Sequence, residues 1–195
     1  QASAFSNAPT NASAYTLSMW VKRVNPGTAE TFAHSNPSAA EYEQLKFNED
    51  DIEYQYNFND GGSEYGSGDF GFNVVTSGLY RDPTAWMHML FRRNAGVADI
   101  FVNGVKEATT TAAQAANTNI KHAHLNDTTG VFEFGRRSYP GTGTSEQFSG
   151  YLAEIIFLDG AFAEPTDLGG WDANGIWMPV DPSGISSSMT GQAII

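Results

Sequence analysis

A nearly unbroken run of apolar and aromatic residues lies near the C-terminal end of the chain, in the sequence SGYLAEIIFLDG (residues 149–160). Gly150 and the turn signal Asp159-Gly160 bound this run, so it is too short to favour a helix. On the two-residue period of a strand, the odd and the even positions form two opposite faces. Because both faces are mostly apolar, the run predicts a strand in the middle of a sheet, with other layers of the protein on both sides.

Alternating hydrophobic and polar positions predict shorter strands along most of the remaining chain. In residues 15–22, for example, Leu17, Met19 and Val21 occupy one face of a half-buried strand. Similar patterns predict strands in residues 31–33, 45–47, 52–58, 70–75, 86–92, 98–102, 105–108 and 131–134. This makes nine to ten short strands without a convincing helix. Such a series is typical of an all-β protein, an antiparallel β-sandwich or jelly roll.

Two pairs of these strands are predicted to form hairpins. The polar sequence Asn48-Glu49-Asp50-Asp51 predicts a four-residue loop between the strands on either side of it. Asn103-Gly104 predicts a type I′ turn, because both residues tolerate the positive φ that this turn requires.

The segments between the other strands are predicted to be loops. Residues 61–71, 109–119 and 138–146 are rich in small and polar residues and predict exposed loops. Near the C-terminal end, residues 164–168 predict one helical turn. Trp171 and Trp177 are expected to anchor a segment without strands against the sheet.

The length of 195 residues suits a single domain that buries roughly 70% of its unfolded surface. We assign residues 1–14 to a polar N-terminal arm, residues 15–180 to the β domain, and residues 181–195 to a C-terminal tail. Both ends are expected to become ordered against a partner outside the domain. The chain begins at Gln1, which is typical of a processed product or an excerpt from a longer polypeptide.

The charge and composition exclude several classes of function. With 22 acidic and 10 basic residues, the net charge is −12, which argues against nucleic-acid binding, since phosphate contacts need clustered Lys and Arg. The chain has no cysteine, so it has neither disulfides nor thiolate metal sites. No apolar segment reaches the ~20 residues that a membrane span requires, and no membrane insertion is expected.

Several segments, taken in chain order, resemble a known family. They are TLSMWVKR, LYRDPTAWMHMLF, ADIFVNGVKEA, FEFGRR, FSGYLAEIIFLDG and PTDLGGWDANGIWMPV. Across residues 14–180 they resemble the laminin-G-like, concanavalin-A-like lectin jelly rolls of bacteriophage virion proteins. The most specific part is residues 150–179, where a strand and a D-G turn precede P-T-D-L and D-A-N-G-I-W.

The resemblance implies a non-enzymatic protein on the surface of a phage particle, in the tail or on the capsid. Its implied work is attachment to a host-surface glycan or to neighbouring virion proteins, and the hypothesis includes self-association into a homo-oligomer. One alternative is a capsid decoration or fibre protein with no glycan affinity. The family offers no catalytic residues to carry over and no cofactor. Calcium is common in laminin-G-like domains and stays an alternative, although no loop here matches an Asp-rich calcium pattern.

Another alternative is a jelly-roll glycoside hydrolase, a depolymerase. Laminarinase-type β-glucanases carry an E-x-D-x-E strand with alternate carboxylates on one side, and Glu49, Asp51 and Glu53 have this spacing. However, Asp50 would then be a buried unpaired acid, and the predicted hairpin places Glu49 and Asp51 in its turn. The sequence therefore favours a solvated turn, and we predict no catalytic residues.

Two further groups of titratable residues are candidates for chemistry. In one interpretation, Glu154 is an isolated carboxylate among apolar neighbours on its strand and acts as an acid. In the favoured interpretation it is half exposed or paired with an arginine. His122 and His124 share one face if they lie on a strand, but they lack a third ligand, and no metal site is predicted.

A glycan site requires exposed aromatic rings with amide or carboxylate neighbours. The candidates for glycan binding are Tyr54, Tyr56, Asn59, Asp60, Tyr65, Tyr139 and Trp171. We assign Trp20, Trp86 and Trp177 mainly to packing.

Overall fold

The computed structural model describes residues 11, 13–36, 41–58, 70–94, 97–113, 125, 131–139 and 143–181. The predictions for residues 1–10 and 182–195, in the arm and the tail, lie outside this part of the chain and stay predictions. The elements are β1 (Ala14–Arg23), β2 (Glu30–Asn36), β3 (Tyr42–Asn48), β4 (Asp51–Phe58), β5 (Phe70–Thr76), β6 (Met87–Asn94), β7 (Val97–Val102), β8 (Val105–Lys106), β9 (Thr109–Ala113), β10 (Val131–Phe134), β11 (Arg137–Tyr139), β12 (Gly143–Ser145), β13 (Gly150–Asp159), the 3-10 helix η2 (Pro165–Asp167), β14 (Gly169–Trp171) and β15 (Trp177–Pro179). No helix among the described residues is long and apolar enough to cross a membrane.

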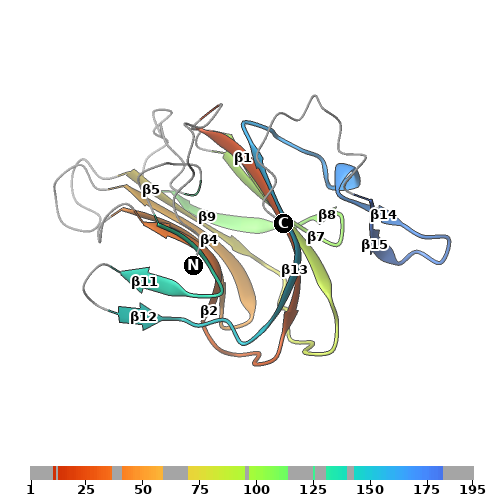
Figure 1. Cartoon of the computed structure of the whole chain (residues 1–195), viewed down its shortest axis with the longest axis horizontal. Coiled ribbons are helices and arrows are strands. Elements are labelled where there is room, and N and C mark those ends of the chain that lie inside the picture. Colours follow the sequence, from red (N-terminus) through yellow and green to blue (C-terminus); the bar gives the residue numbers. More distant parts are fainter. Residues whose placement is uncertain are drawn as a thin grey trace.

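The strands form two large antiparallel sheets that pack face to face (Figure 1). One sheet has the order β13-β1-β6-β7-β8, and the other has the order β10-β2-β3-β4-β5-β9. Two short ribbons, β11-β12 and β14-β15, complete the described strands. The predicted antiparallel β-sandwich of the concanavalin-A-like jelly-roll type is confirmed.

The position of β13 corrects one prediction. This strand pairs with β1 and lies at the edge of the five-stranded sheet, not in its middle. Its last four residues are buried, whereas its first half is partly exposed. The two apolar faces have separate causes: Phe157 faces the core between the sheets, while Ile156 and Leu158 face a smaller cluster on the outer side. A strand at the edge of a sheet, such as β13, can therefore be covered on both of its faces.

Three predicted loops and turns also differ from the structure. Residues 109–113, predicted as a loop, form β9 beside β5, where threonines suit an extended backbone. Part of the predicted loop 138–146 pairs as β11 and β12. In the β3-β4 hairpin Asn48 pairs with Asp51, so the connection has two residues and not four.

The other predicted turns agree with the structure. Asn103 and Gly104 both have positive φ, 48° and 78°, as a type I′ turn requires. The predicted helical turn is η2, and Trp177 is the buried anchor that was expected. The segment around Trp177 is nevertheless not free of strands, since β14 and β15 pair with each other.

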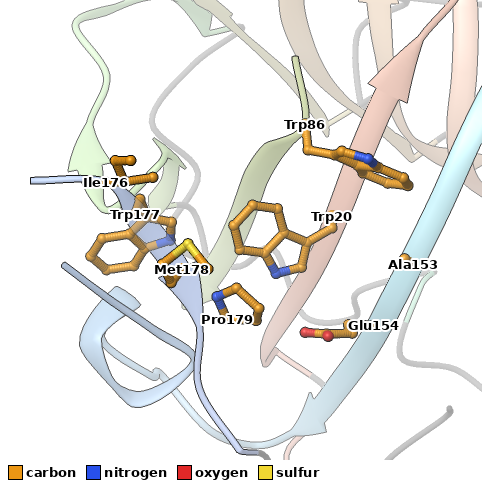
Figure 2. A pocket seen from close by; sticks show the side chains of 8 residues that line it. All are labelled: Trp20, Trp86, Ala153, Glu154, Ile176, Trp177, Met178 and Pro179. Carbon is orange, nitrogen blue, oxygen red and sulfur yellow. The ribbon is translucent and has the colours of Figure 1, made fainter. Parts of the chain in front are cut away.

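The C-terminal segment folds back onto the outer face of the five-stranded sheet, where Trp177 of β15 bonds to His88 of β6 and lines a cavity together with Trp20 of β1 (Figure 2). Thr16 Oγ1 donates to the carbonyl of Ala161 at 2.8 Å and accepts from the amide of Ala163 at 3.0 Å. Arg92 Nη1 donates to the Ala163 carbonyl at 3.1 Å and to Glu164 Oε1 at 2.7 Å. These contacts hold the segment that leads into β14 and β15.

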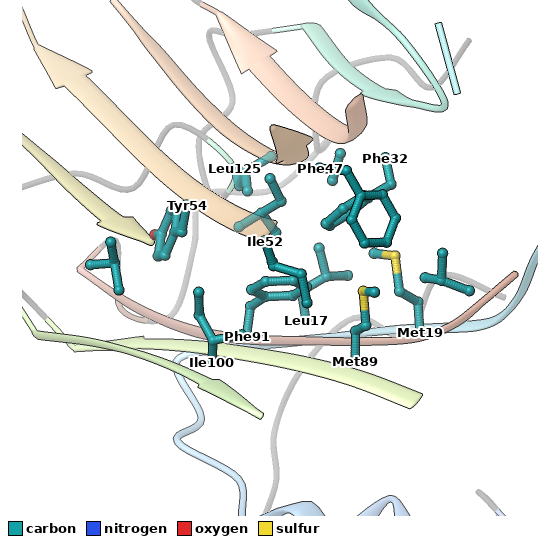
Figure 3. Close-up of a cluster of buried hydrophobic side chains, with 14 of the residues drawn as sticks. Leu17, Met19, Phe32, Phe47, Ile52, Tyr54, Met89, Phe91, Ile100 and Leu125 are labelled. Carbon is teal, nitrogen blue, oxygen red and sulfur yellow. The ribbon is translucent and has the colours of Figure 1, made fainter. Parts of the chain in front are cut away.

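The main core lies between the two large sheets (Figure 3). Leu17, Met19 and Val21 enter it from β1, as their alternation predicts. Phe47 and Ile52 enter it from the opposite sheet. Because odd positions of β1 face this core, even positions such as Trp20 face outward, which prepares the site described next.

Candidate functional site

A cavity of about 410 Å³ opens on the outer side of the five-stranded sheet. Its lining residues come from β1, the segment before β6, β13 and the β14-β15 ribbon with its connecting turn, which we call the C-terminal ribbon. They are Trp20, Trp86, Ala153, Glu154, Ile176, Trp177, Met178 and Pro179. We call this cavity the aromatic groove, because three of its eight lining residues are tryptophans.

The side chains of the aromatic groove come from segments that are distant in the sequence. In Figure 2, Trp20 stands between the C-terminal ribbon, with Trp177 and Met178, and the opposite wall, with Trp86 and Glu154. The wall formed by β13 exists only because this strand lies beside β1, where Trp20 pairs with Ala153.

Trp177 anchors the C-terminal ribbon, which forms one wall of the aromatic groove, the ribbon wall. Its indole Nε1 donates to His88 Nδ1 at 2.9 Å, and the two rings stack with centroids 5.9 Å apart. The other ring nitrogen of His88, Nε2, lies 2.7 Å from Ser18 Oγ. Two glycines make room for the indole: a Cβ on Gly104 or on Gly169 would lie 2.3 or 2.4 Å from Trp177 ring atoms.

The sequence D-A-N-G-I-W shapes the tip of the ribbon. Asp172 Oδ1 accepts from the amides of Asn174 and Ile176, both at 2.8 Å. The pKa of Asp172 is lowered, and the hydrogen bond from the Ile176 amide makes the largest contribution. Gly175 has φ 76°, which closes the turn. This turn presents Ile176 to the groove and places Trp177 against His88.

Exposed aromatic rings form the rim opposite the ribbon. Trp86 is 42% exposed and Tyr151 is 60% exposed, and their ring centroids are 6.3 Å apart at an angle of 51°. Tyr151 therefore extends the surface of Trp86 beyond the lining of the groove. Two adjacent accessible rings of this kind can stack against the apolar face of a ligand.

Glu154 is the one ionisable side chain among the lining residues. It lies in a β-bulge, in which Glu154 and Ile155 lie opposite the single residue Met19 of β1. Its φ is 47°, a left-handed conformation that is uncommon for a residue with a side chain. Its carboxylate is exposed and makes no ion pair with the described residues. Of the two outcomes in the favoured interpretation of Glu154, exposure or pairing with an arginine, the structure shows exposure.

The structure corrects two of the predicted glycan-binding residues. Tyr54 and Tyr56 are 0% and 3% exposed, because the even positions of β4 face the core. The Tyr54 hydroxyl donates to Glu43, and the guanidinium of Arg93 lies 4.1 Å from the ring centroid of Tyr56. Neither ring offers a free face to a ligand, so both belong to the core and not to a binding platform.

The remaining predicted glycan residues are not brought together in the described part of the chain. Trp171 is 54% exposed on β14, where it packs edge to face on Trp177 beside the aromatic groove without lining it. Tyr139 lies in β11, and its side chain is outside the described part. Asn59, Asp60 and Tyr65 lie outside the described residues and stay predictions.

The E-x-D-x-E pattern does not form an open pair of carboxylates. Glu49 occupies the β3-β4 turn with φ 59°, and Asp51 begins β4. Glu53 is buried and lies 3.4 Å from Lys46 Nζ. Asp50 accepts from Arg81 at 2.6 Å, a bond that lowers the pKa of Asp50. The hairpin turn predicted for this segment is therefore present.

The outer face of the six-stranded sheet carries a polar network covered by the β11-β12 ribbon. Glu146 lies 3.8 Å from Lys46 and accepts from Arg137 at 3.0 Å and from Thr31 Oγ1 at 3.0 Å. Lys46 and Thr31 are buried beneath this network. The aromatic groove is the candidate site that the described residues build.

Metal binding finds no support in the described part of the chain, where no three His, Asp or Glu side chains cluster as ligands. His34 and His88 are buried there. His122 and His124 lie outside the described residues.

The sequence interpretation missed the aromatic groove because it assigned its three tryptophans to packing. For Trp177 this was right, but Trp86 is 42% exposed. The available signal was the alternation of β1, which places Trp20 on the outward face. The pairing of Trp20 with β13 and its closeness to β15 have no local signal.

Comparison with known proteins agrees with this architecture. The model of the Laminin_G_3 family, described as the concanavalin A-like lectin/glucanases superfamily, matches residues 1–165. None of the curated proteins matches the chain.

Several solved structures share the fold. A proposed carbohydrate-binding protein from Bacteroides ovatus is 17% identical with a TM-score of 0.55, over 84% of this chain and 42% of that one. The carbohydrate-binding module CBM40 of the Ruminococcus gnavus IT-sialidase, bound to α2,3-sialyllactose, is 14% identical with a TM-score of 0.51, over 75% of each chain. A heptameric SAP-like pentraxin from Limulus polyphemus is 14% identical with a TM-score of 0.52, over 82% of this chain and 70% of that one.

Proposed function

Since this chain belongs to the Laminin_G_3 family of the concanavalin A-like lectin/glucanases superfamily, we propose that it is a non-enzymatic glycan-binding domain whose binding site is the aromatic groove. The observation that carries the proposal is the combination, in one cavity, of the accessible indole ring of Trp86 with the carboxylate of Glu154, which has no ion-pair partner among the described residues. Pyranose rings have an apolar face that stacks on aromatic rings, and their hydroxyls donate hydrogen bonds to carboxylates.

Trp86 and Glu154 have complementary roles in this proposal. The exposed face of Trp86, extended by Tyr151, is the stacking platform. Glu154, without an ion-pair partner among the described residues, accepts from sugar hydroxyls beside it. Trp177 acts as a positioning residue, because its bond to His88 holds the ribbon wall in place.

The arrangement of carboxylates supports binding without hydrolysis. Glycoside hydrolases typically use two carboxyl groups that flank the scissile bond, whereas a single carboxylate lines the aromatic groove. Two of the similar structures are a carbohydrate-binding module and a proposed carbohydrate-binding protein, which is consistent with this proposal.

We also propose that the domain is carried on a phage particle, where it attaches the particle to a host glycan beside other virion proteins. The support is the resemblance of residues 150–179 to phage structural proteins. Within this segment, the D-A-N-G-I-W turn builds the ribbon wall of the groove. Immunogold labelling of purified particles with an antibody against this domain tests the location, and unlabelled particles would contradict it.

The binding experiment is a calorimetric titration with oligomers of glucose, N-acetylglucosamine, glucosamine and galacturonic acid, with parallel measurement of new reducing ends. We expect saturable binding to at least one oligomer and no new ends. Trp86→Ala and Tyr151→Ala should each weaken binding about tenfold, because each removes a stacking ring. Val97→Ala, at an exposed position outside the groove, is the control and should bind as the wild type does.

Two outcomes would overturn the proposal. Absence of binding to all four oligomers would leave the alternative of a decoration or fibre protein that contacts only other virion proteins. New reducing ends that disappear in Glu49→Gln or Glu53→Gln would make the protein a depolymerase.

A further inference from the structure

Resting on the proposed glycan-binding function, we infer that the aromatic groove selects sugars that carry a protonated amine and rejects acidic sugars. The charge and the aromatic composition of the groove together determine the sign of the charge on a ligand that fits there.

The charge of the groove is negative. Glu154 is the one ionisable group in the lining, and it has no ion-pair partner among the described residues. On the same outward face of β1, Lys22 lies outside the lining, and its charge acts on Asp82. The chain as a whole has a net charge of −12. A second carboxylate brought by a uronic or sialic acid would meet Glu154 without a compensating cation in the lining.

The aromatic walls favour the same sign of charge. The face of an indole ring carries negative charge density and attracts cations within about 6 Å, and tryptophan is the strongest of the aromatic side chains in this respect. Trp20, Trp86 and Trp177 all line the groove. Trp177 is buried against His88, so the exposed face of Trp86 is the one that an ammonium group on a sugar can reach, in the same cavity as the carboxylate of Glu154.

The backbone at Glu154 is an independent observation. Glycine is the usual residue in a left-handed conformation, yet a glutamate occupies this one in the bulge of β13. Bulges often occur beside functional sites, where they redirect a side chain. Residues that hold such conformations are concentrated at ligand sites. The bulge directs the carboxylate of Glu154 into the lining of the groove (Figure 2).

The test compares the tetramers of glucosamine, N-acetylglucosamine and galacturonic acid by calorimetry, at a pH at which the glucosamine amine is protonated. We expect the glucosamine tetramer to bind about tenfold more tightly than its N-acetylated counterpart, and the galacturonate tetramer to bind most weakly. Glu154→Gln keeps the size of the side chain and removes its charge. It should weaken binding of the glucosamine tetramer about tenfold and change binding of the N-acetylated tetramer less than about twofold.

Glu49→Gln is the matched control, because Glu49 is an exposed glutamate in the β3-β4 turn, also has a positive φ, and changes the net charge equally. It should leave all three affinities unchanged. Equal or tighter binding of galacturonate, or an equal effect of Glu154→Gln on both amino-sugar tetramers, would overturn the inference while leaving glycan binding established. Failure of every oligomer to bind would instead overturn the proposed function.

Discussion

At the scale of single residues, His88 connects the outer face of the sheet to the C-terminal ribbon. The indole N–H of Trp177 can only donate, so His88 Nδ1 must accept and the ring proton must lie on Nε2, which donates to Ser18 Oγ. The neutral ring is therefore the form that the structure requires. Burial lowers the pKa of His88 to about 4 from its usual 6.5.

This pKa predicts a dependence of stability on pH. Between pH 6.5 and 4 the unfolded chain binds a proton that folded His88 does not, so the free energy of unfolding should fall as the pH decreases through this window. The contribution is fully present above pH 6.5 and amounts to about 3 kcal/mol. Urea unfolding at several pH values measures it. His88→Gln lacks the titrating ring and should show a shallower dependence, and identical slopes would contradict the prediction.

At the scale of elements, the β14-β15 ribbon depends on a close fit between Trp177 and two glycines. Gly169 approaches the indole from within the ribbon, and Gly104 approaches it from the β7-β8 turn. Neither position has room for a Cβ atom. Gly104 also has φ 78°, so a side chain there would meet backbone strain as well as the ring.

Gly169→Ala should displace Trp177 and loosen the ribbon, because the new Cβ would lie 2.4 Å from the ring. We expect the free energy of unfolding to fall by about 1 to 3 kcal/mol, the usual cost of overpacking, and glycan affinity to fall with it. Gly170→Ala is the matched control, since its Cβ would meet Val180 at an ordinary 3.5 Å. Urea unfolding and tryptophan fluorescence measure both variants, and equal stability of the two would contradict the proposed fit.

At the scale of the whole molecule, an ion pair inside the core joins the two large sheets. Arg93 of β6 donates to Glu43 Oε1 of β3 at 2.9 Å, and both side chains are fully buried. Glu43 also accepts from the Tyr15 hydroxyl at 2.9 Å and from the Leu125 amide at 2.8 Å. Burial, followed by the charge of Glu43, raises the pKa of Tyr15 well above its usual value, so this hydroxyl keeps its proton.

Glu43→Gln should lower the free energy of unfolding by about 3 to 5 kcal/mol, because it removes the carboxylate charge that neutralises the buried guanidinium of Arg93. The paired replacement Glu43→Leu with Arg93→Met removes both charges and should cost less than the single substitution. Urea unfolding of the two variants measures the difference. If the paired variant is as unstable as Glu43→Gln, the cost comes from lost packing and not from the unpaired charge.

The sequence by itself determined the elements whose signal is local. Alternation along residues 15–22 and the Asn103-Gly104 turn both operate within a few residues, so they predicted β1 and the β7-β8 hairpin. The same holds for the class of fold, since a series of short strands without helices leaves few architectures. The hairpin that contains Glu49 also had a local signal. Its prediction correctly placed Glu49 in a turn and not on a catalytic strand.

Only the tertiary structure decided which faces are covered and which stay open. The sequence pattern makes Tyr54 a candidate platform, but the opposite sheet covers it. The apolar pattern of β13 predicts a central strand, but its outer face packs against residues 161–168. The aromatic groove depends on contacts such as that between His88 and Trp177, which are 89 residues apart. A local pattern specifies the backbone and the sides of a strand. The neighbour on each side is chosen by packing between distant segments, and that choice places Glu154 beside three tryptophans.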